Sequence, residues 1–277
     1  MNKLIAILFF VIAYSSSTAQ SGLSDELKQN EDQLYASTKQ LNQFFRRFNG
    51  EEDQEGNRLY DGDKKYRDTG LRKDFIASLI DQENSNISES TLKEFVKFAT
   101  DKKNPCFVDL HSKQLISEVS AVYTHNGREI DMLMLMKIQP QGQGSEWVID
   151  DIVYDGFKDL FVKDTSESKQ FIHPMSHELE FMTLKKAFRN TQYPEQYTGR
   201  GFQPDYLTLF LFELKSDRLQ FKTVKQVKFH IFDIDGWYFE ISNFNRSGYN
   251  SGWLISNLTK VTDSQKNLLK NYIYDKN

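Results

Sequence analysis

Apolar residues recur with a helical period in three segments of the first part of the chain. The first, residues 31–48, ends at Asn49–Gly50, a typical C-terminal stop for a helix. A polar segment rich in Gly and Asp follows at residues 51–67 and is predicted to be a surface loop. Helical spacing resumes over residues 72–82 and again after Ser90, which we expect to be the N-cap of a third helix.

The period then changes from that of a helix to that of a strand. Alternating and β-branched segments predict four strands, over residues 107–111, 115–123, 129–138 and 147–154. Asn126–Gly127 lies between the second and third strands, and both of its residues accept the positive φ of a type I′ hairpin turn. Helices followed by an antiparallel meander predict an α+β fold, because a doubly wound α/β fold would alternate its helices and strands.

The second half of the chain repeats this order. A helix is predicted over residues 176–189, a loop rich in Tyr and Gly over residues 193–201, and a helix with Pro204 in its first turn. Further segments with strand or helix patterns come after them. They predict strands over residues 219–233, 236–244 and 252–261, and a closing helix over residues 263–272.

The charged, irregular segment at residues 159–169 is predicted to separate two tandem domains, residues 21–158 and 170–277. Each domain is expected to pack helices on a curved antiparallel sheet. Trp147 and Trp253 occupy similar places in the last strand of each meander, within Ser-Glu-Trp-Val-Ile and Ser-Gly-Trp-Leu-Ile. This similarity indicates an internal duplication, with two unrelated meanders as the alternative.

The start of the chain has the pattern of a secretory leader. Lys3 is followed by an uninterrupted apolar run of ten residues, 4–13. A membrane-spanning helix needs about 20 apolar residues, so the run matches a signal-peptide core instead. Ser17 and Ala19 supply the small residues that precede a cleavage site. Residues 1–20 are therefore predicted to be a signal peptide, and the protein is expected in the periplasm or outside the cell. We expect no lipid anchor, because no Cys stands at the predicted cleavage site.

Composition narrows the range of partners. Cys106 is the single cysteine, so no internal disulfide can form, and we interpret its thiol as a small buried hydrophobe rather than a nucleophile. Without residues 1–20 the chain has 34 basic and 39 acidic side chains, a net charge of −5. This acidic balance argues against nucleic acid and against an anionic membrane surface as partners. No later apolar run in the sequence reaches membrane length.

Three blocks of sequence resemble a family of secreted proteins. They are Phe45-Arg46-Arg47-Phe48-Asn49-Gly50-Glu51-Glu52-Asp53 with Gly56, then Gln203-Pro204-Asp205-Tyr206-Leu207, and Asn250-Ser251-Gly252-Trp253-Leu254-Ile255-Ser256. The blocks look like those of uncharacterised two-domain secreted proteins of Bacteroidetes. The resemblance implies that the first domain is an NTF2-like (cystatin-like) α+β cone, with helices across a strongly curved antiparallel sheet. It implies no activity and no site residue, because the motif residues of that family have no assigned role.

Two groups of residues have the composition of metal sites without the spacing. His173 and His177 are four residues apart, but Pro174 stands where a zinc-binding HExxH motif has its Glu, so we interpret this segment as a helix cap. Asp61–Gly62–Asp63 and Glu51–Glu52–Asp53 are acidic, yet they lack the alternating ligands and the final Glu of an EF-hand loop. We therefore assign no metal and no cofactor.

Polar side chains on the predicted strands offer material for a general base. Asp109 and His111 would share one face of a strand, as would Tyr123 and His125, with Asp131 across the hairpin. If they converged in the cone of the first domain, a hydrolase or isomerase would be the alternative function. Strands place polar side chains on their outer face by default, so we assign no catalytic residue.

Aromatic residues gather in and after the second-half loop, at Tyr193, Tyr197, Phe202 and Tyr206. Exposed aromatic side chains in loops bind sugars or peptides, or else they cover a core, so no ligand-binding residue is assigned. Taken together, the sequence favours an exported binding or assembly protein of the bacterial cell envelope over an enzyme. The expected partner is a protein, peptide or glycan.

Overall fold

The described part of the chain covers most of the sequence after residue 40. The computed structural model describes residues 41–83, 86–142, 144–161, 172–182, 184–187, 189, 194–199, 201–246 and 250–275. The predicted signal peptide and most of the predicted interdomain segment lie outside these residues. Within them, no helix combines the length and the apolar character needed to cross a membrane.

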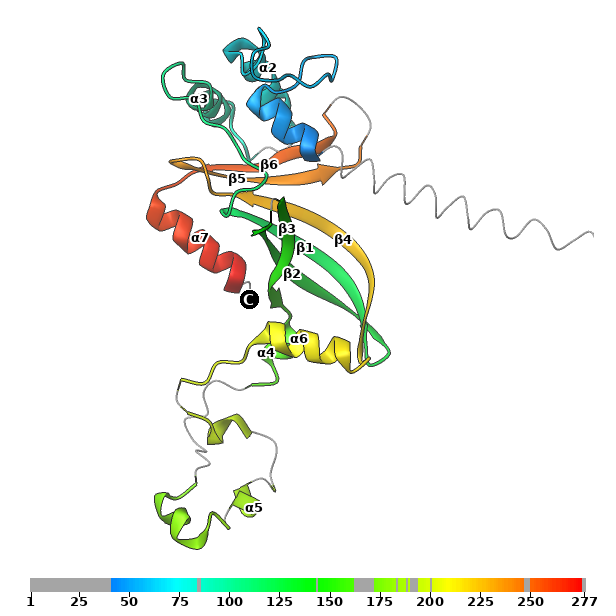
Figure 1. Cartoon of the computed structure of the whole chain (residues 1–277), viewed down its shortest axis with the longest axis vertical. Coiled ribbons are helices and arrows are strands. Elements are labelled where there is room, and N and C mark those ends of the chain that lie inside the picture. The colour runs from blue at the N-terminus through cyan, green and yellow to red at the C-terminus, as the bar shows by residue number, and fades with distance from the viewer. Residues whose placement is uncertain are drawn as a thin grey trace, which may run out of the picture. The chain divides into compact units, whose positions relative to one another are not determined.

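The protein is α+β, as predicted (Figure 1). Its helices are one at residues 41–49, α2 (Thr69–Ser78), α3 (Glu89–Ala99), α4 (Asp155–Lys158), α5 (Leu184–Ala187), α6 (Tyr206–Lys215) and α7 (Asp263–Asp275), with 3-10 helices η2 (Pro174–Leu179) and η3 (Pro194–Tyr197). Its strands are β1 (Leu115–His125), β2 (Arg128–Gln141), β3 (Gly144–Val153), β4 (Leu219–Ile231), β5 (Trp237–Phe244) and β6 (Gly252–Lys260).

All six strands belong to one open antiparallel sheet with the order β3-β2-β1-β4-β5-β6. The two predicted meanders therefore meet at a central β1–β4 pair, in which Ser120 lies opposite Gln226. This mirrored order is what a duplicated three-stranded meander would produce. The sequence predicted two tandem domains, 21–158 and 170–277, each with its own sheet, and that division is not confirmed.

The chain instead divides into two compact units, and both are discontinuous in sequence. Unit 1 consists of Met1–Leu110 with Ile241–Leu258, and unit 2 consists of His111–Glu240 with Thr259–Asn277. The β5–β6 hairpin contributes to both units, so neither can be cut out as a continuous segment. Each unit has its own buried side chains and is described separately below.

The core of unit 1 is formed by the apolar faces of its helices. Phe44, Phe48, Ile76 and Phe95 are all at most 1% exposed. The rings of Phe48 and Phe95 lie 6.2 Å apart between their centres, which joins the helix at residues 41–49 to α3. These are the positions that the helical period of the sequence predicted to face inward.

Capping residues set where α2 and α3 begin. Asp68 accepts a hydrogen bond from Leu71 N at 2.9 Å, so α2 starts at Thr69, before the predicted residue 72. Ser88 Oγ accepts from Thr91 N at 3.1 Å and is the N-cap of α3. The prediction of Ser90 as that cap was wrong, because α3 begins at Glu89 and Ser90 already lies in its first turn.

The predicted strand at residues 107–111 does not form. Its backbone is satisfied by a side chain instead: Asn49 Nδ2 donates to Val108 O at 2.8 Å, and Val108 N donates to Asn49 Oδ1 at 3.0 Å. An alternating sequence signals extended backbone, but it does not show whether a neighbouring strand or an amide side chain binds that backbone.

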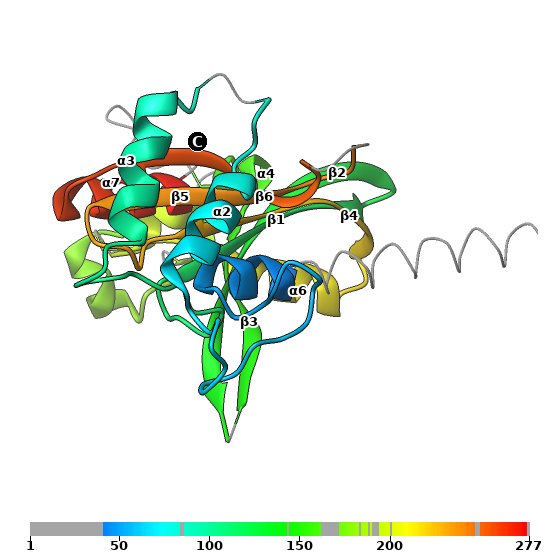
Figure 2. The ribbon, with the colours of Figure 1, turned by 90° about the horizontal axis from the view of Figure 1, so that it is seen from above.

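The sheet of unit 2 is covered on both faces (Figure 1). On one face α4 and α6 pack over a cluster that contains Val119, Ala121 and Tyr123 of β1. On the other face α7 packs over a cluster that contains Ile116 of β1 and Ile273 of α7 itself. Successive residues of β1 thus serve two separate cores, as the alternation of a strand requires. Figure 2 shows the β2–β3 hairpin projecting from the rest of the sheet, and residues 139–142, 144 and 145 near its end are exposed.

The turn prediction is confirmed and two helix predictions are corrected. Asn126 and Gly127 have φ of +50° and +78°, as a type I′ turn requires. The helix predicted over residues 176–189 is replaced by η2 and α5, because Glu180 and Phe181 adopt left-handed φ of +49° and +53°. Pro204 lies before the N-cap Asp205 rather than inside the first turn of α6.

Replacing Asn49 with Ala leaves two buried backbone groups of Val108 without their partner. We expect a loss of about 1–3 kcal/mol in the free energy of unfolding, measured by urea denaturation. The exposed Gln54→Ala is the matched control and should change stability little. Equal effects of the two substitutions would show that the Asn49 amide does not support the segment around Val108.

Candidate functional site

A polar pocket of about 540 Å³ lies in unit 2 beside the start of α6. The end of β3, helix α4, the residues before α6 and the C-terminal helix all contribute to its wall. Its volume falls in the range of about 300–1,000 Å³ that is typical of small-molecule sites. Six polar side chains line it: Asp151, Lys158, Gln203, Asp205, Tyr206 and Tyr274.

The position of the α6 residues in this pocket is fixed by a helix cap. Asp205 Oδ1 accepts from Thr208 N at 3.1 Å, and Asp205 Oδ2 accepts from Thr208 Oγ1 at 2.6 Å. These hydrogen bonds lower the pKa of the Asp205 carboxyl. The cap orients the first turn of α6, so that Tyr206 packs against the α6-side core and also reaches the pocket.

Two phenols in the wall remain protonated at neutral pH. The pKa of Tyr206 is raised by burial and then by the negative charge of Asp151. Burial raises the pKa of Tyr274 to about 12, with a further contribution from the hydrogen bond that its hydroxyl donates to Asp150 Oδ2 at 2.6 Å. Both pKa values are raised further above neutral pH, so these hydroxyl groups are suited to hydrogen bonding rather than to general-base catalysis.

The aromatic part of the wall connects the pocket with the predicted aromatic loop. Phe161 lines the pocket, and its ring is 5.7 Å from that of Phe202 in an edge-on arrangement. Phe202 is 45% exposed and therefore still presents apolar surface to solvent. Tyr197 is half-buried in η3 and is not part of the wall, while Tyr193 lies outside the described residues.

The structure does not assemble the predicted general-base group. Tyr123 is buried and donates its hydroxyl hydrogen to Met134 Sδ at 3.1 Å, and burial raises its pKa. His125 Nε2 lies 3.3 Å from Glu213 Oε2. Asp131 is opposite Val122, so its side chain is on the other face of the sheet from Tyr123, where it pairs with Lys225 at 2.6 Å.

The space that a catalytic cone would need is occupied by core side chains. Phe157 and Phe210 are buried against the α6-side face of the sheet, and the ring of Phe210 is 5.7 Å from that of Tyr123. Asp109 and His111 are exposed on the segment that forms no strand. The side chains on which the alternative prediction of an enzyme was based therefore do not form one site.

The residues considered for metal binding are engaged in the fold. His173 is the N-cap of η2, its Nδ1 accepting from Met175 N at 3.1 Å, and the His177 ring bonds Pro174 O at 2.8 Å. Glu52 is fully buried and bound by Arg46 at 3.1 Å and Arg47 at 2.9 Å. Among the described residues, no three His, Cys, Asp or Glu side chains converge as a metal site would need.

The structure reveals a buried polar chain that the sequence did not indicate. On the α7 side of the sheet, Glu118 Oε2 is 2.9 Å from His230 Nε2, and His230 Nδ1 is 2.8 Å from the Tyr238 hydroxyl oxygen. The Tyr238 hydroxyl donates to Glu240 at 3.0 Å. Exposure is 6% for Glu118, 2% for His230 and 3% for Tyr238.

The hydrogen atoms in the hydrogen bonds that link Glu118, His230, Tyr238 and Glu240 can be assigned. Because the Tyr238 hydroxyl donates to Glu240, His230 Nδ1 must donate to the hydroxyl oxygen. The contact between His230 Nε2 and Glu118 then also holds one hydrogen, either on the nitrogen or on the carboxyl. Glu118 and His230 are 112 residues apart and meet only through the β1–β4 pairing, so no local motif announces them.

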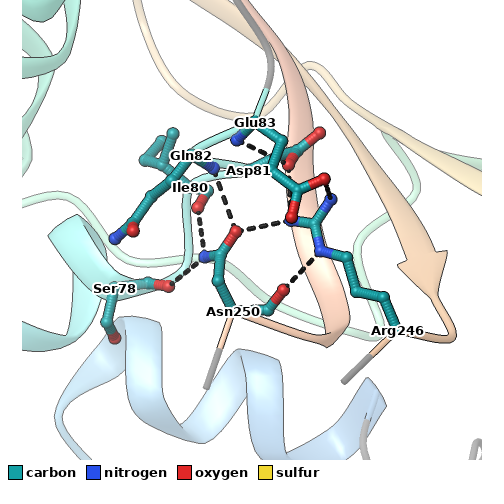
Figure 3. Close-up of polar contacts among 7 residues, drawn as sticks. All are labelled: Ser78, Ile80, Asp81, Gln82, Glu83, Arg246 and Asn250. Carbon is teal, nitrogen blue, oxygen red and sulfur yellow. Dashed lines mark hydrogen bonds and ion pairs between the residues drawn. The ribbon is translucent and has the colours of Figure 1, made fainter. Parts of the chain in front are cut away.

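The third sequence block, residues 250–256, binds the segment that follows α2 in unit 1, and Figure 3 shows the contacts of Asn250. Asn250 Nδ2 donates to Ile80 O at 2.7 Å, and its Oδ1 accepts from Gln82 N at 3.0 Å. Arg246 Nη2 binds Asp81 Oδ1 at 2.6 Å and also Asn250 Oδ1. A parallel bridge between Ile80 and Ile255 continues the contact. The side chains of Asn250 and Arg246 therefore stabilise the segment after α2.

Replacing Asp205 with Ala should remove the cap of α6 and cost about 0.5–2 kcal/mol in the free energy of unfolding. Because the folded-state pKa of Asp205 is lowered, its stabilisation is complete above the unfolded pKa and is lost as the pH falls through the folded one. Asp205→Asn caps equally well but does not titrate. In urea denaturation at about pH 7 and about pH 3, the advantage of the wild type over Asp205→Ala should be smaller at the lower pH, whereas Asp205→Asn should have the same advantage at both.

Replacing His230 with Ala leaves Glu118 and Tyr238 buried without their shared partner. We expect a loss of about 3–5 kcal/mol in the free energy of unfolding. The exposed His177→Ala is the control and should change stability little. If His230→Ala fails to fold, Tyr238→Phe removes only the hydroxyl and should cost about 1–3 kcal/mol. Neutral effects of both core substitutions would contradict a stabilising role for this chain.

Comparison with known proteins adds no relative to the argument. No protein-family model, no curated protein and no solved structure matches this chain. The resemblance to secreted proteins of Bacteroidetes stays a prediction from the three sequence blocks. The chemistry of the pocket is therefore the basis for the proposed function.

Proposed function

We propose that the protein is an exported, soluble binding module of the bacterial cell envelope, and that it holds a saccharide in the pocket beside α6. Export follows from the signal-peptide pattern at residues 1–20. The observation that carries the ligand class is the mixture of hydrogen-bond donors and acceptors around an aromatic side chain in one small pocket.

The polar groups of the pocket match the hydroxyl groups of a sugar. A sugar hydroxyl donates one hydrogen bond and accepts others, so it needs both kinds of partner. Tyr206 and Lys158 can donate, and the Gln203 amide can both donate and accept. Asp151 can accept, as can the oxygen of the Tyr274 hydroxyl, whose hydrogen is donated to Asp150. Phe161 offers an apolar surface for the C–H face of the ring. Such a small number of placed polar groups on a partly apolar wall is typical of small-molecule sites.

The charge of the pocket favours a neutral ligand over a polyanion. Two carboxylates, Asp151 and Asp205, stand against the single ammonium group of Lys158. Asp205 is already committed to Thr208, and Asp151 Oδ1 accepts from Ile152 N at 2.7 Å. A phosphate or sulfate would therefore meet one cation and an excess of negative charge.

Two finer proposals on architecture accompany the function. We propose that the mirrored meanders descend from one duplicated α+β unit and that the curved sheet under α6 is of the NTF2-like kind. The strand order and the similar Trp147 and Trp253 segments support the duplication. Core side chains such as Phe157 and Phe210 cover the α6-side face of the sheet, and the proposed binding pocket is lined by residues of β3, α4, α6 and α7.

The proposal is tested by screening the protein without residues 1–20 on a glycan array and then titrating the best saccharide by calorimetry. Tyr206→Phe and Gln203→Ala each remove polar atoms from the pocket, and each should weaken binding about 3- to 10-fold. Tyr206→Phe keeps the ring that packs on the core, so thermal unfolding should be nearly unchanged.

The matched control is Tyr60→Phe, which removes a hydroxyl from an exposed tyrosine of unit 1. It should bind as the wild type does. Absence of any saccharide signal on the array would refute the ligand class. Binding that is insensitive to both pocket substitutions would refute the site.

A further inference from the structure

A second concave surface lies in unit 1, between α2 and α3. Its volume is about 590 Å³, and it runs along one side of each helix. On α3 the residues that line it follow helical spacing, with Leu92 and Val96 four residues apart. Lys73 and Ala77 are likewise four residues apart on α2. We call this surface the α2–α3 groove.

The floor of the α2–α3 groove is aliphatic. Ala77, Leu92 and Val96 are half-buried, so each still presents part of its side chain to the groove. They form a narrow apolar strip about one helical turn long, since Leu92 and Val96 are four residues apart on α3. Such a strip suits a flexible hydrocarbon chain. It offers no aromatic anchor of the kind that dominates protein–protein contacts.

The rim of the α2–α3 groove is cationic. Lys73, Lys93, Lys97 and Lys102 line it, against the two acidic residues Glu89 and Asp101. The groove therefore carries two positive charges in excess, on a chain whose net charge is −4. Positive charge concentrated on an acidic protein indicates an anionic occupant.

The lysines of the rim are largely available to a ligand. Lys93 pairs with Glu89 at 2.5 Å across one helical turn, and both side chains are exposed. Asp101 accepts from Lys103 N at 2.8 Å and Asn104 N at 2.9 Å. Within the part of the chain that the structure describes, Lys73, Lys97 and Lys102 form no salt bridge. Their methylene stems can extend the apolar floor while the ammonium groups stay in water.

We propose that the α2–α3 groove binds a fatty-acid anion, with the hydrocarbon chain over Ala77, Leu92 and Val96 and the carboxylate among the rim lysines. The charge complementarity of the rim and the aliphatic floor both favour this ligand. The site is in unit 1 and takes an amphiphile, so it is independent of the saccharide pocket in unit 2.

The test titrates the protein without residues 1–20 with laurate below its micelle concentration, by calorimetry, and repeats the titration with neutral lauryl alcohol. Laurate should bind at one site per chain, more weakly as salt is added, and more tightly than the alcohol. Methyl NMR should show shifts at Ala77, Leu92 and Val96. Equal binding of the alcohol, or shifts confined to the saccharide pocket, would overturn the proposal.

Charge-reversal variants supply the decisive comparison. Lys73→Glu combined with Lys97→Glu changes two exposed side chains and should weaken laurate binding about 4- to 25-fold, since each lost ion pair contributes about 2- to 5-fold. Lys64→Glu with Lys113→Glu makes the same change in net charge away from the groove and should leave binding unchanged. Saccharide binding should be the same in both double variants. No laurate binding, or equal loss in the two double variants, would overturn the site.

Discussion

The need to satisfy buried backbone groups without a disulfide shapes this protein more than any other constraint. Long polar side chains reach into the interior and bind main-chain carbonyls where no strand or helix can. Arg72 Nε donates to Phe48 O at 3.1 Å, and Lys266 Nζ donates to Phe232 O at 2.9 Å and Ile234 O at 2.6 Å. Asn49 and Asn250 do the same with their amides. Each such donor replaces a hydrogen bond that water would supply to the unfolded chain. Removal of the donor therefore leaves a buried carbonyl without a hydrogen bond, which lowers the free energy of unfolding.

The same local physics places both proposed binding surfaces. The caps at Asp68 and Ser88 fix where α2 and α3 begin, and both helices contribute residues to the α2–α3 groove. The cap at Asp205 fixes the start of α6 and carries Tyr206 into the saccharide pocket. Gly50 has a φ of +70°, and a Cβ there would lie 2.6 Å from Arg72 Cγ, so the turn that admits Arg72 requires glycine.

Local structure could be predicted from the sequence where one segment determines its own environment. The faces of the helices that bury Phe48 and Phe95 and the Asn126–Gly127 turn were evident from periodicity and from backbone preference. The joining of the two meanders into one sheet could not be predicted, because the β1–β4 pair connects segments about a hundred residues apart. For the same reason Tyr206 could be singled out in the sequence, whereas its association with Asp151, Lys158 and Tyr274 in one pocket required the fold.

The first and third distinctive blocks of the sequence contribute no residue to the proposed sites, whereas four residues of the second block, Gln203–Tyr206, line the pocket beside α6. Glu52, Asn49 and Asn250 are distinctive because their side chains must fit one buried arrangement of donors and acceptors. The groups proposed to meet a ligand in the α2–α3 groove are instead common surface residues such as Lys73 and Lys97, which have no local signature. Their function depends on the rigid neighbours that hold them. A substitution at Glu52, Asn49 or Asn250 should therefore act on binding indirectly, through stability, whereas one at Gln203 or Lys97 should act on binding alone.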